Sequence, residues 1–167
     1  MNYIIRKGER KDCFGIAHVV TVAWNETYQG IVPNDFLGNL KNDEKERAKA
    51  LYDNYEINNY HELVLEINNE IVGFVRFGIA EDNEFENCGE IYALYIMAKY
   101  KGNGFGRKLV EEAIQEIKKF DCDKMVISCL KGNPSNEFYK HMGGKYIKDR
   151  LFEKLNLLEN VYYYENI

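Results

Sequence analysis

The stretch that most constrains the fold runs from residue 91 to residue 117 and reads IYALYIMAKYKGNGFGRKLVEEAIQEI. Its first seven residues are apolar on both faces of an extended chain, which is typical of a strand buried in the middle of a sheet. Three glycines at alternate positions follow, and apolar residues then recur at helical spacing. A buried strand, a glycine turn and an amphipathic helix in this order predict an α/β layered domain.

The other strands are indicated by short runs of β-branched and aromatic residues. Asn68 and Asn69 separate two such runs and predict a β-hairpin with a short turn. The predicted strands besides the central one cover residues 3–7, 62–67, 70–80, 124–130, 145–149 and 160–165.

Three further helical regions are expected besides the helix that follows the glycines. The first begins after Asp12, a plausible N-cap, and ends near Gly30. The second covers residues 34–54 with an interruption around Gly38, and a short one starts near Pro134 and stops at Gly143. The resulting order is β-α-α-β-β-β-α-β-α-β-β. We predict one domain over residues 1–167, with a mixed, mostly antiparallel sheet of about seven strands flanked by helices.

Charge and composition exclude several classes of function. The net charge of −5 argues against non-specific nucleic-acid binding. The first residues are charged too early for a signal peptide, and no apolar run approaches the roughly 20 residues that cross a bilayer. The four cysteines show neither zinc-ligand spacing nor a disulfide framework, so reduced, buried thiols and no bound metal are expected. These features predict a cytoplasmic protein that does not associate with membranes.

The glycine stretch is suited to binding an anion. Gly102, Gly104 and Gly106 precede a helix N-terminus, where backbone amides and the helix dipole favour negative charge. Lys101 and Arg107 add positive charge. A P-loop is rejected because no Ser or Thr follows the basic pair, and GxGxG in the second half of the chain fits a dinucleotide fold weakly. A turn without a ligand is the remaining structural alternative.

Four segments in order resemble the GNAT superfamily of N-acetyltransferases. Lys101, Gly104 and Gly106 fill its acetyl-CoA loop pattern, Gln/Arg-x-x-Gly-x-Gly/Ala, with Lys in place of Gln or Arg. AWNETYQGIVPNDFL is similar to the first-helix region of a subset, EIVGFVRF to its second hairpin strand and GNPSNEFYKHMGG to its later helix motif. The resemblance implies that the ligand is the CoA pyrophosphate, held by the backbone of Gly102, Asn103, Gly104, Phe105, Gly106 and Arg107.

The resemblance also assigns roles around the reaction centre. Such enzymes splay the fourth and fifth strands and bind the pantetheine arm to the fourth, here at Leu94, Tyr95 and Ile96. Tyr139 occupies the position of the general acid that protonates the CoA thiolate, although it is equally readable as a core aromatic. Asn133 and Asn136 are candidates to contact pantetheine or order a water, with helix capping as the alternative for Asn133.

The sequence says less about the general base and about the site of the acceptor amine. Glu90 is the candidate general base, against the alternative of a solvated strand-end carboxylate. Trp24, Tyr28 and the acidic run 81–86 would suit a cationic amine, although a core Trp and a solubilising loop explain them as well. The expected function is transfer of an acetyl group to a small-molecule primary amine.

The sequence alone leaves two alternative functions and the question of a homodimer open. A non-catalytic acyl-CoA sensor would keep the loop without thioester cleavage, and a nucleotide-binding protein is disfavoured by the motif mismatches. A homodimer through an apolar edge such as NVYYYE is a further expectation.

Overall fold

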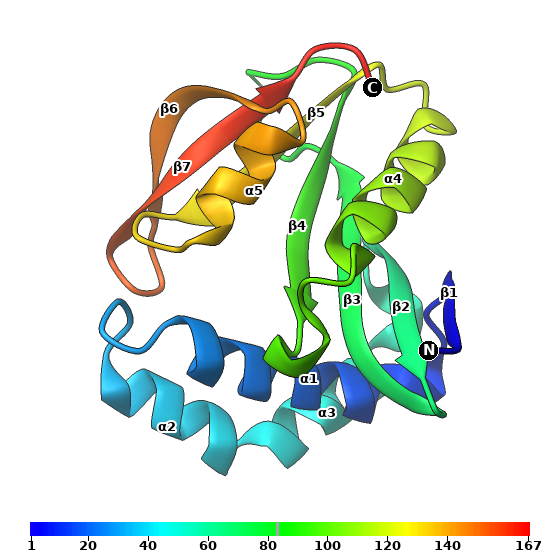
Figure 1. Cartoon of the computed structure of the whole chain (residues 1–167), viewed down its shortest axis with the longest axis vertical. Helices are drawn as coiled ribbons and strands as arrows, with labels where there is room; N and C mark the ends of the chain where they lie inside the picture. The colour runs from blue at the N-terminus through cyan, green and yellow to red at the C-terminus, as the bar shows by residue number, and fades with distance from the viewer. Residues whose placement is uncertain (83) are drawn as a thin grey trace. The chain divides into compact units, whose positions relative to one another are not determined.

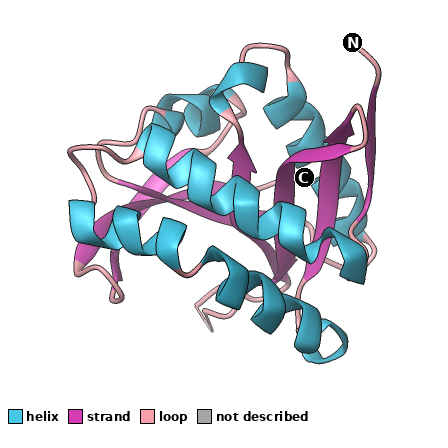
Figure 2. Ribbon diagram, turned by 90° about the horizontal axis from the view of Figure 1, so that it is seen from below, coloured by secondary structure: helices cyan, strands magenta, loops and turns pink. Residues whose placement is uncertain are grey.

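The computed structural model describes residues 1–82 and 84–167 (Figures 1 and 2). Helices and strands joined by short loops make up most of the chain (Figure 2). The strands are β1 (Tyr3–Lys7), β2 (His61–Ile67), β3 (Glu70–Ile79), β4 (Cys88–Ile96), β5 (Lys124–Leu130), β6 (Lys145–Phe152) and β7 (Leu157–Tyr164). The α-helices are α1 (Cys13–Thr27), α2 (Asn34–Asn42), α3 (Glu44–Asp53), α4 (Phe105–Lys118) and α5 (Ser135–His141).

The seven strands form one sheet in the order β1-β2-β3-β4-β5-β7-β6. β4 pairs with β5 in parallel, whereas β1–β2, β5–β7 and β6–β7 pair antiparallel. This confirms the predicted mixed, mostly antiparallel sheet of seven strands with helices on it. β4 is the central strand, which explains why its sequence is apolar on both faces.

The chain forms two compact units, and the prediction of a single domain over residues 1–167 stays a prediction. The first unit comprises residues 1–76 and 93–110. Its helix α1 packs against α3 and α2, and the three helices appear in blue to cyan in Figure 1. Gly73 lies so close to Ile96 that a Cβ there would come within 3.0 Å of the Ile96 side chain.

The second unit comprises residues 77–92 and 111–167. Its short helix α5 packs on β5 and β7 (Figure 1). The cluster of Cys88, Val126 and Val161 forms buried core on the other sheet face. Gly89 is required on the helical face, because a Cβ there would come within 2.3 Å of the Ile117 side chain of α4.

The helical zone after residue 33 is interrupted at Asp43, so the predicted interruption around Gly38 is wrong. Gly38 lies inside α2, and nothing within 4 Å would meet a side chain there. The break falls where Asp43 N–H donates to Asn39 O and Asp43 O accepts from Arg47 N–H. Asp43 therefore ends one helix and begins the next.

Asp12 precedes α1 as predicted, but its side chain does not cap that helix. A 3-10 helix, Arg10–Asp12, comes before α1, and Asp12 Oδ2 accepts from the backbone N–H of Glu9 at 2.8 Å. The carboxylate also receives two bonds from Arg6, at 2.7 and 3.0 Å. The hydrogen bond from Arg6, with the one from Glu9, holds the pKa of Asp12 below its usual value although burial opposes this.

The strand expected to mediate a dimer is an inner strand. β7, which contains NVYYYE, pairs with β5 on one side and β6 on the other. Its backbone groups are therefore engaged within the sheet, and that route to a dimer is wrong. β1 and β6 are the edge strands.

Cys13, Cys88, Cys122 and Cys129 are free and buried, as predicted. Burial raises the pKa of each of these thiols, which keeps them protonated and unreactive. Within residues 1–82 and 84–167, no group of three or more potential metal-ligating side chains occurs. The described helices include none that is both long and apolar enough to cross a membrane.

Candidate functional site

The glycine loop lies in the first unit and leads directly into α4. Gly102 and Gly104 have φ angles of +79° and +78°, in the left-handed region that favours glycine. A Cβ at either position would meet nothing within 4 Å. The backbone conformation, not crowding by neighbouring atoms, therefore requires glycine, and the space beside the loop is open to a ligand.

The loop is folded by its own side chains and by the start of the helix. Asn103 Nδ2 donates to the carbonyls of Tyr100 and Lys101 at 3.1 and 3.2 Å. At the start of α4, Lys108 N–H donates to Gly104 O at 3.1 Å in an i to i−4 bond. The first turn of a helix has backbone N–H groups without an i−4 carbonyl partner, which is the feature on which the anion-binding prediction depends.

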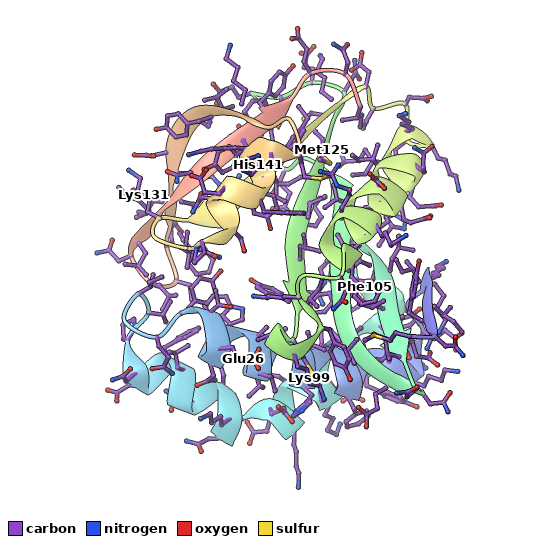
Figure 3. All side chains as sticks on the ribbon, viewed as in Figure 1. Glu26, Lys99, Phe105, Met125, Lys131 and His141 are labelled. Atoms are coloured by element: carbon purple, nitrogen blue, oxygen red, sulfur yellow. The ribbon has the colours of Figure 1, made fainter. Side chains whose placement is uncertain are left out.

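Phe105 fixes the helix start in the first unit. Its ring is buried and meets Tyr3 edge-on, with ring centroids 5.0 Å apart. Figure 3 labels Phe105 at the beginning of α4. Lys101 and Arg107 lie on either side of it in sequence, and both are exposed. A rigid backbone flanked by cations is the arrangement expected for a pyrophosphate.

The predicted pantetheine segment is the last part of β4, and its binding role stays a prediction. Leu94 and Tyr95 are half-buried and Ile96 is buried. Just beyond them, Met97 N–H donates to Val72 O of β3 at 3.0 Å. This bond ties the end of β4 to its neighbour β3 within the first unit.

In the second unit, the pairing of β4 with β5 stops before β5 ends. The register begins at Cys88 opposite Lys124 and runs to Ile91 opposite Ile127. β5 continues to Leu130, where it is paired with β7. The last three residues of β5 therefore have no β4 partner in the described register.

Glu26, which no sequence pattern indicated, positions the segment that leads to the loop. Glu26 Oε2 accepts from the backbone N–H of Ala98 at 2.7 Å. Ala98 begins the 3-10 helix Ala98–Tyr100, whose N-cap residue Met97 supplies no side-chain bond. Figure 3 labels Glu26 on α1 and Lys99 on this short helix. A carboxylate from a distant helix thus performs the capping role.

We expect Glu26→Ala to raise the Kd for acetyl-CoA by about 5-fold, because losing a cap costs about 1 kcal/mol. Glu26→Gln keeps an acceptor oxygen and is the control, with a smaller expected change. Calorimetric titration of each variant gives the two constants. Equal Kd values for Glu26→Ala and the unchanged protein would show that Glu26 does not position the loop.

Aromatic side chains cluster in the first unit around Trp24. Its ring lies 4.6 Å from Tyr28, 5.6 Å from Phe36 and 6.1 Å from Tyr95, centroid to centroid. Trp24 is 9% exposed and Tyr28 5% exposed, so both are mainly core residues. Phe36 and Tyr95 are half-buried and present the more accessible faces. Contact of Trp24 and Tyr28 with an acceptor stays a prediction.

Tyr139 lies on α5 in the second unit and is 6% exposed. Its ring is 5.3 Å from Phe138 and 6.2 Å from Tyr162. Its carbonyl oxygen accepts from the hydroxyl of Tyr164 at 2.7 Å and from Gly144 N–H at 3.0 Å. The backbone and ring are thus fixed by contacts that do not depend on the phenol.

The two predicted asparagines serve the start of α5. Asn136 Nδ2 donates to the carbonyls of Leu130 and Asn133, while Oδ1 accepts from Asn160 Nδ2 and Tyr162 OH. These four bonds use its hydrogen-bonding capacity, so Asn136 holds α5 on the sheet. Asn133 Oδ1 accepts from Ser135 N–H at 2.8 Å, which is the capping alternative.

Glu90 lies inside β4, not at a solvated strand end, and is 6% exposed. Its register partner is Val126, whereas Tyr162 beside α5 is paired with Ile127. Because neighbouring residues of a strand point to opposite faces, Glu90 and α5 lie on opposite faces of this sheet.

Burial raises the pKa of Glu90, and the nearby Arg150 opposes that rise. A raised pKa suits a proton acceptor for an amine.

Two residues of the acidic run 81–86, which belongs to the second unit, pair with Lys148 of β6. The Lys148 ammonium contacts Asp82 at 3.2 Å and also contacts Glu84. Phe85 stacks on Tyr163 with centroids 6.3 Å apart. Asn83, which belongs to the predicted acidic loop, lies outside the described residues.

A cavity of about 640 Å³ in the first unit contains none of the predicted site residues. Arg6, Asp12 and Glu66 line part of it, and Arg6 bonds to Asp12 at 2.7 Å and to Glu66 at 2.6 Å. The charges of these three residues are thus engaged with one another.

The glycine loop before α4, the central β4 and the sheet order define an acetyltransferase fold. The sequence matches the acetyltransferase (GNAT) family over residues 21–143, and the chain belongs to that family. This confirms the resemblance found in the sequence.

Particular relatives agree with this assignment. The chain is 24% identical to N-acetyltransferase YuaI of Bacillus subtilis over 152 residues, which is 89% of this chain and 84% of the relative. It is similar in fold to PaiA N-acetyltransferase of Thermoplasma acidophilum in complex with coenzyme A (TM-score 0.78, 20% identity, 98% and 100% of the two chains). YncA of Salmonella typhimurium with acetyl-CoA gives a TM-score of 0.69 at 22% identity, over 99% and 94% of the chains.

Proposed function

We propose that this acetyltransferase uses acetyl-CoA to acetylate a primary amine of a small molecule. The observation that carries the proposal is the loop of Gly102 and Gly104, with positive φ angles and open space beside it, directly before α4. The solved relatives from Thermoplasma acidophilum and Salmonella typhimurium contain coenzyme A and acetyl-CoA. The backbone of residues 102–107 holds the pyrophosphate, and the cations Lys101 and Arg107 add charge.

Acetyl-CoA supplies a thioester, and the residues of the chain bind it and move the protons. The backbone groups of Leu94, Tyr95 and Ile96 bind the pantetheine arm. Glu90 accepts a proton from the amine, and its buried position and raised pKa support this role. Tyr139 lies on the sheet face opposite Glu90, and it donates its phenolic proton to the CoA thiolate at the end of the β4–β5 ladder, beyond Ile91 and Ile127. A thiol of pKa about 8.5 and a phenol near 10 are closely matched.

Calorimetric titration with acetyl-CoA and with ATP tests the ligand assignment, and thiol release against a panel of amines tests the reaction. We expect acetyl-CoA to bind, ATP not to bind, and thiol release with a primary amine. Binding of ATP without binding of acetyl-CoA would overturn the proposal. Binding of acetyl-CoA without thiol release for any amine would favour the sensor function instead.

A further inference from the structure

A second polar cluster lies in the second unit, on the sheet face opposite α5. Glu90 of β4, Ser128 of β5, Arg150 of β6 and Glu159 of β7 all have their register positions on this face. Arg150 is the direct partner of Glu159, and Ser128 is the partner of Val161. Four strands thus bring two carboxylates, one hydroxyl and one guanidinium together.

The guanidinium of Arg150 approaches both carboxylates without bonding closely to either. Its Nη1 is 3.6 Å from Glu90 Oε1, and its Nε is 3.8 Å from Glu159 Oε1. Both distances exceed those of a good hydrogen bond. By contrast, Arg76 contacts Glu62 at 2.7 Å, which shows what a tight pair looks like in this protein.

Two polar atoms of the cluster are buried without a hydrogen-bond partner. Within the described part of the chain, neither Glu90 Oε1 nor Ser128 Oγ has such a partner. A buried acceptor left unsatisfied costs about 1–3 kcal/mol, so such atoms call for an explanation. A ligand that donates hydrogen bonds would satisfy both.

The cluster has an excess of acceptors and of negative charge. Two carboxylates face one guanidinium, so the formal charge is −1 when both acids are ionised. Burial raises the pKa of Glu159 as it does that of Glu90, with Arg150 opposing both shifts. The missing component is therefore a donor-rich cation, and a primary ammonium has three donors and one positive charge.

The position of the cluster on β5 agrees with a ligand site. Ser128 is the first residue of β5 after the last described pair with β4, Ile91 opposite Ile127. A strand edge that loses its partner has backbone groups available to a ligand. The cluster thus spans the end of the β4–β5 ladder, with Glu90 inside the ladder and Ser128 just beyond it.

We propose that Glu90, Ser128 and Glu159 form the acceptor subsite, and that the acceptor is a cationic amine without a carboxylate. The inference rests on the proposed acetyl transfer and deepens it by naming the substrate class. Glu90 and Ser128 bind the reacting amine, while Glu159 attracts further positive charge on the same molecule. Arg150 is a positioning residue that holds the two carboxylates and limits their charge.

Protons and bonds balance in this transfer. The ammonium gives one proton to Glu90, and the amine nitrogen forms a bond to the thioester carbonyl carbon. The C–S bond breaks, and the thiolate takes the proton that Tyr139 donates. The second proton of the attacking nitrogen restores the phenol through solvent, and the proton on Glu90 is released. The products are the acetamide, CoA thiol and one proton.

Three amines with the same four-carbon chain test the charge requirement: 1,4-diaminobutane, 1-aminobutane and 4-aminobutanoate. Each is titrated calorimetrically into the protein alone and into the protein with CoA. We expect affinity to fall in the order given, with about 10-fold or more between the first and the last, which is about 1.4 kcal/mol. Tighter binding of 4-aminobutanoate, or no binding of 1,4-diaminobutane, would overturn the inference.

Two variants with opposite expected effects separate the effect of charge from structural damage. The quantity compared is the ratio of the Kd for 1-aminobutane to the Kd for 1,4-diaminobutane. Glu159→Gln should lower this ratio several-fold, whereas Arg150→Gln should raise it. Glu62→Gln, which alters a carboxylate in the first unit, is the control and should leave the ratio unchanged. Ratios that move in the same direction in both test variants would contradict the proposal.

Acetyl-CoA titrations of the same variants distinguish failure of the acceptor subsite from failure of the proposed function. Normal acetyl-CoA binding with no discrimination among the amines would overturn the acceptor subsite alone. Failure of the unchanged protein to bind acetyl-CoA would overturn the proposed function.

Discussion

Gly104→Val is expected to raise the Kd for acetyl-CoA by at least about 100-fold, because two or more charge-assisted bonds of about 1.5–3 kcal/mol each are lost. The φ of Gly104 is +78°, which a β-branched residue adopts only with strain. The substitution therefore moves the backbone amides that we propose to face the pyrophosphate, and it fills the open space beside them. Calorimetric titration with acetyl-CoA measures this loss of affinity.

Gly30→Val is the matched control for backbone strain. Gly30 has a φ of +80°, and a Cβ added there would also meet nothing within 4 Å. Both substitutions thus impose similar strain on the first unit, but only Gly104 precedes the N-terminus of α4. We expect Gly30→Val to lower the melting temperature comparably and to retain acetyl-CoA binding. A folded Gly104→Val protein with normal affinity would refute the assignment of the loop.

Local sequence signals predicted the elements whose conformation depends on a few neighbouring residues. Asn68 and Asn69 have φ angles of 53° and 65°, so the predicted hairpin turn uses the left-handed conformations that asparagine tolerates. Gly143, with a φ of +100°, ends the last short helix region as expected. Gly38 was a misleading signal because a glycine inside a helix costs only about 1 kcal/mol, which packing offsets.

The parts of the site that were missed depend on residues far apart in the chain. Glu26 and Ala98 are 72 positions apart, and no local pattern links them. Arg150 meets Glu90 through the order of strands, which places β7 between β5 and β6. The same order makes NVYYYE an inner strand. Motif matching located the glycine loop because its chemistry is contained in a few consecutive residues.

Tyr139→Phe is expected to lower kcat by one order of magnitude or more while the Kd for acetyl-CoA stays nearly constant. The substitution removes only the phenolic oxygen. The ring keeps its packing against Phe138 and Tyr162, and the carbonyl keeps its bond from Tyr164. A loss of kcat with unchanged affinity therefore reports on proton donation to the thiolate. Steady-state thiol release and calorimetry supply the two numbers.

Tyr162→Phe removes a neighbouring phenol that has a structural role. Its hydroxyl donates to Asn136 Oδ1 at 2.7 Å, and both residues are buried. Deleting it should destabilise the protein by about 1–3 kcal/mol, the cost of weakening a buried hydrogen-bond network, with little change in kcat of the folded fraction. The two phenols thus give opposite patterns: Tyr139→Phe changes the rate and Tyr162→Phe changes the stability. An unchanged kcat in Tyr139→Phe would exclude Tyr139 as the acid and leave solvent to protonate the thiolate.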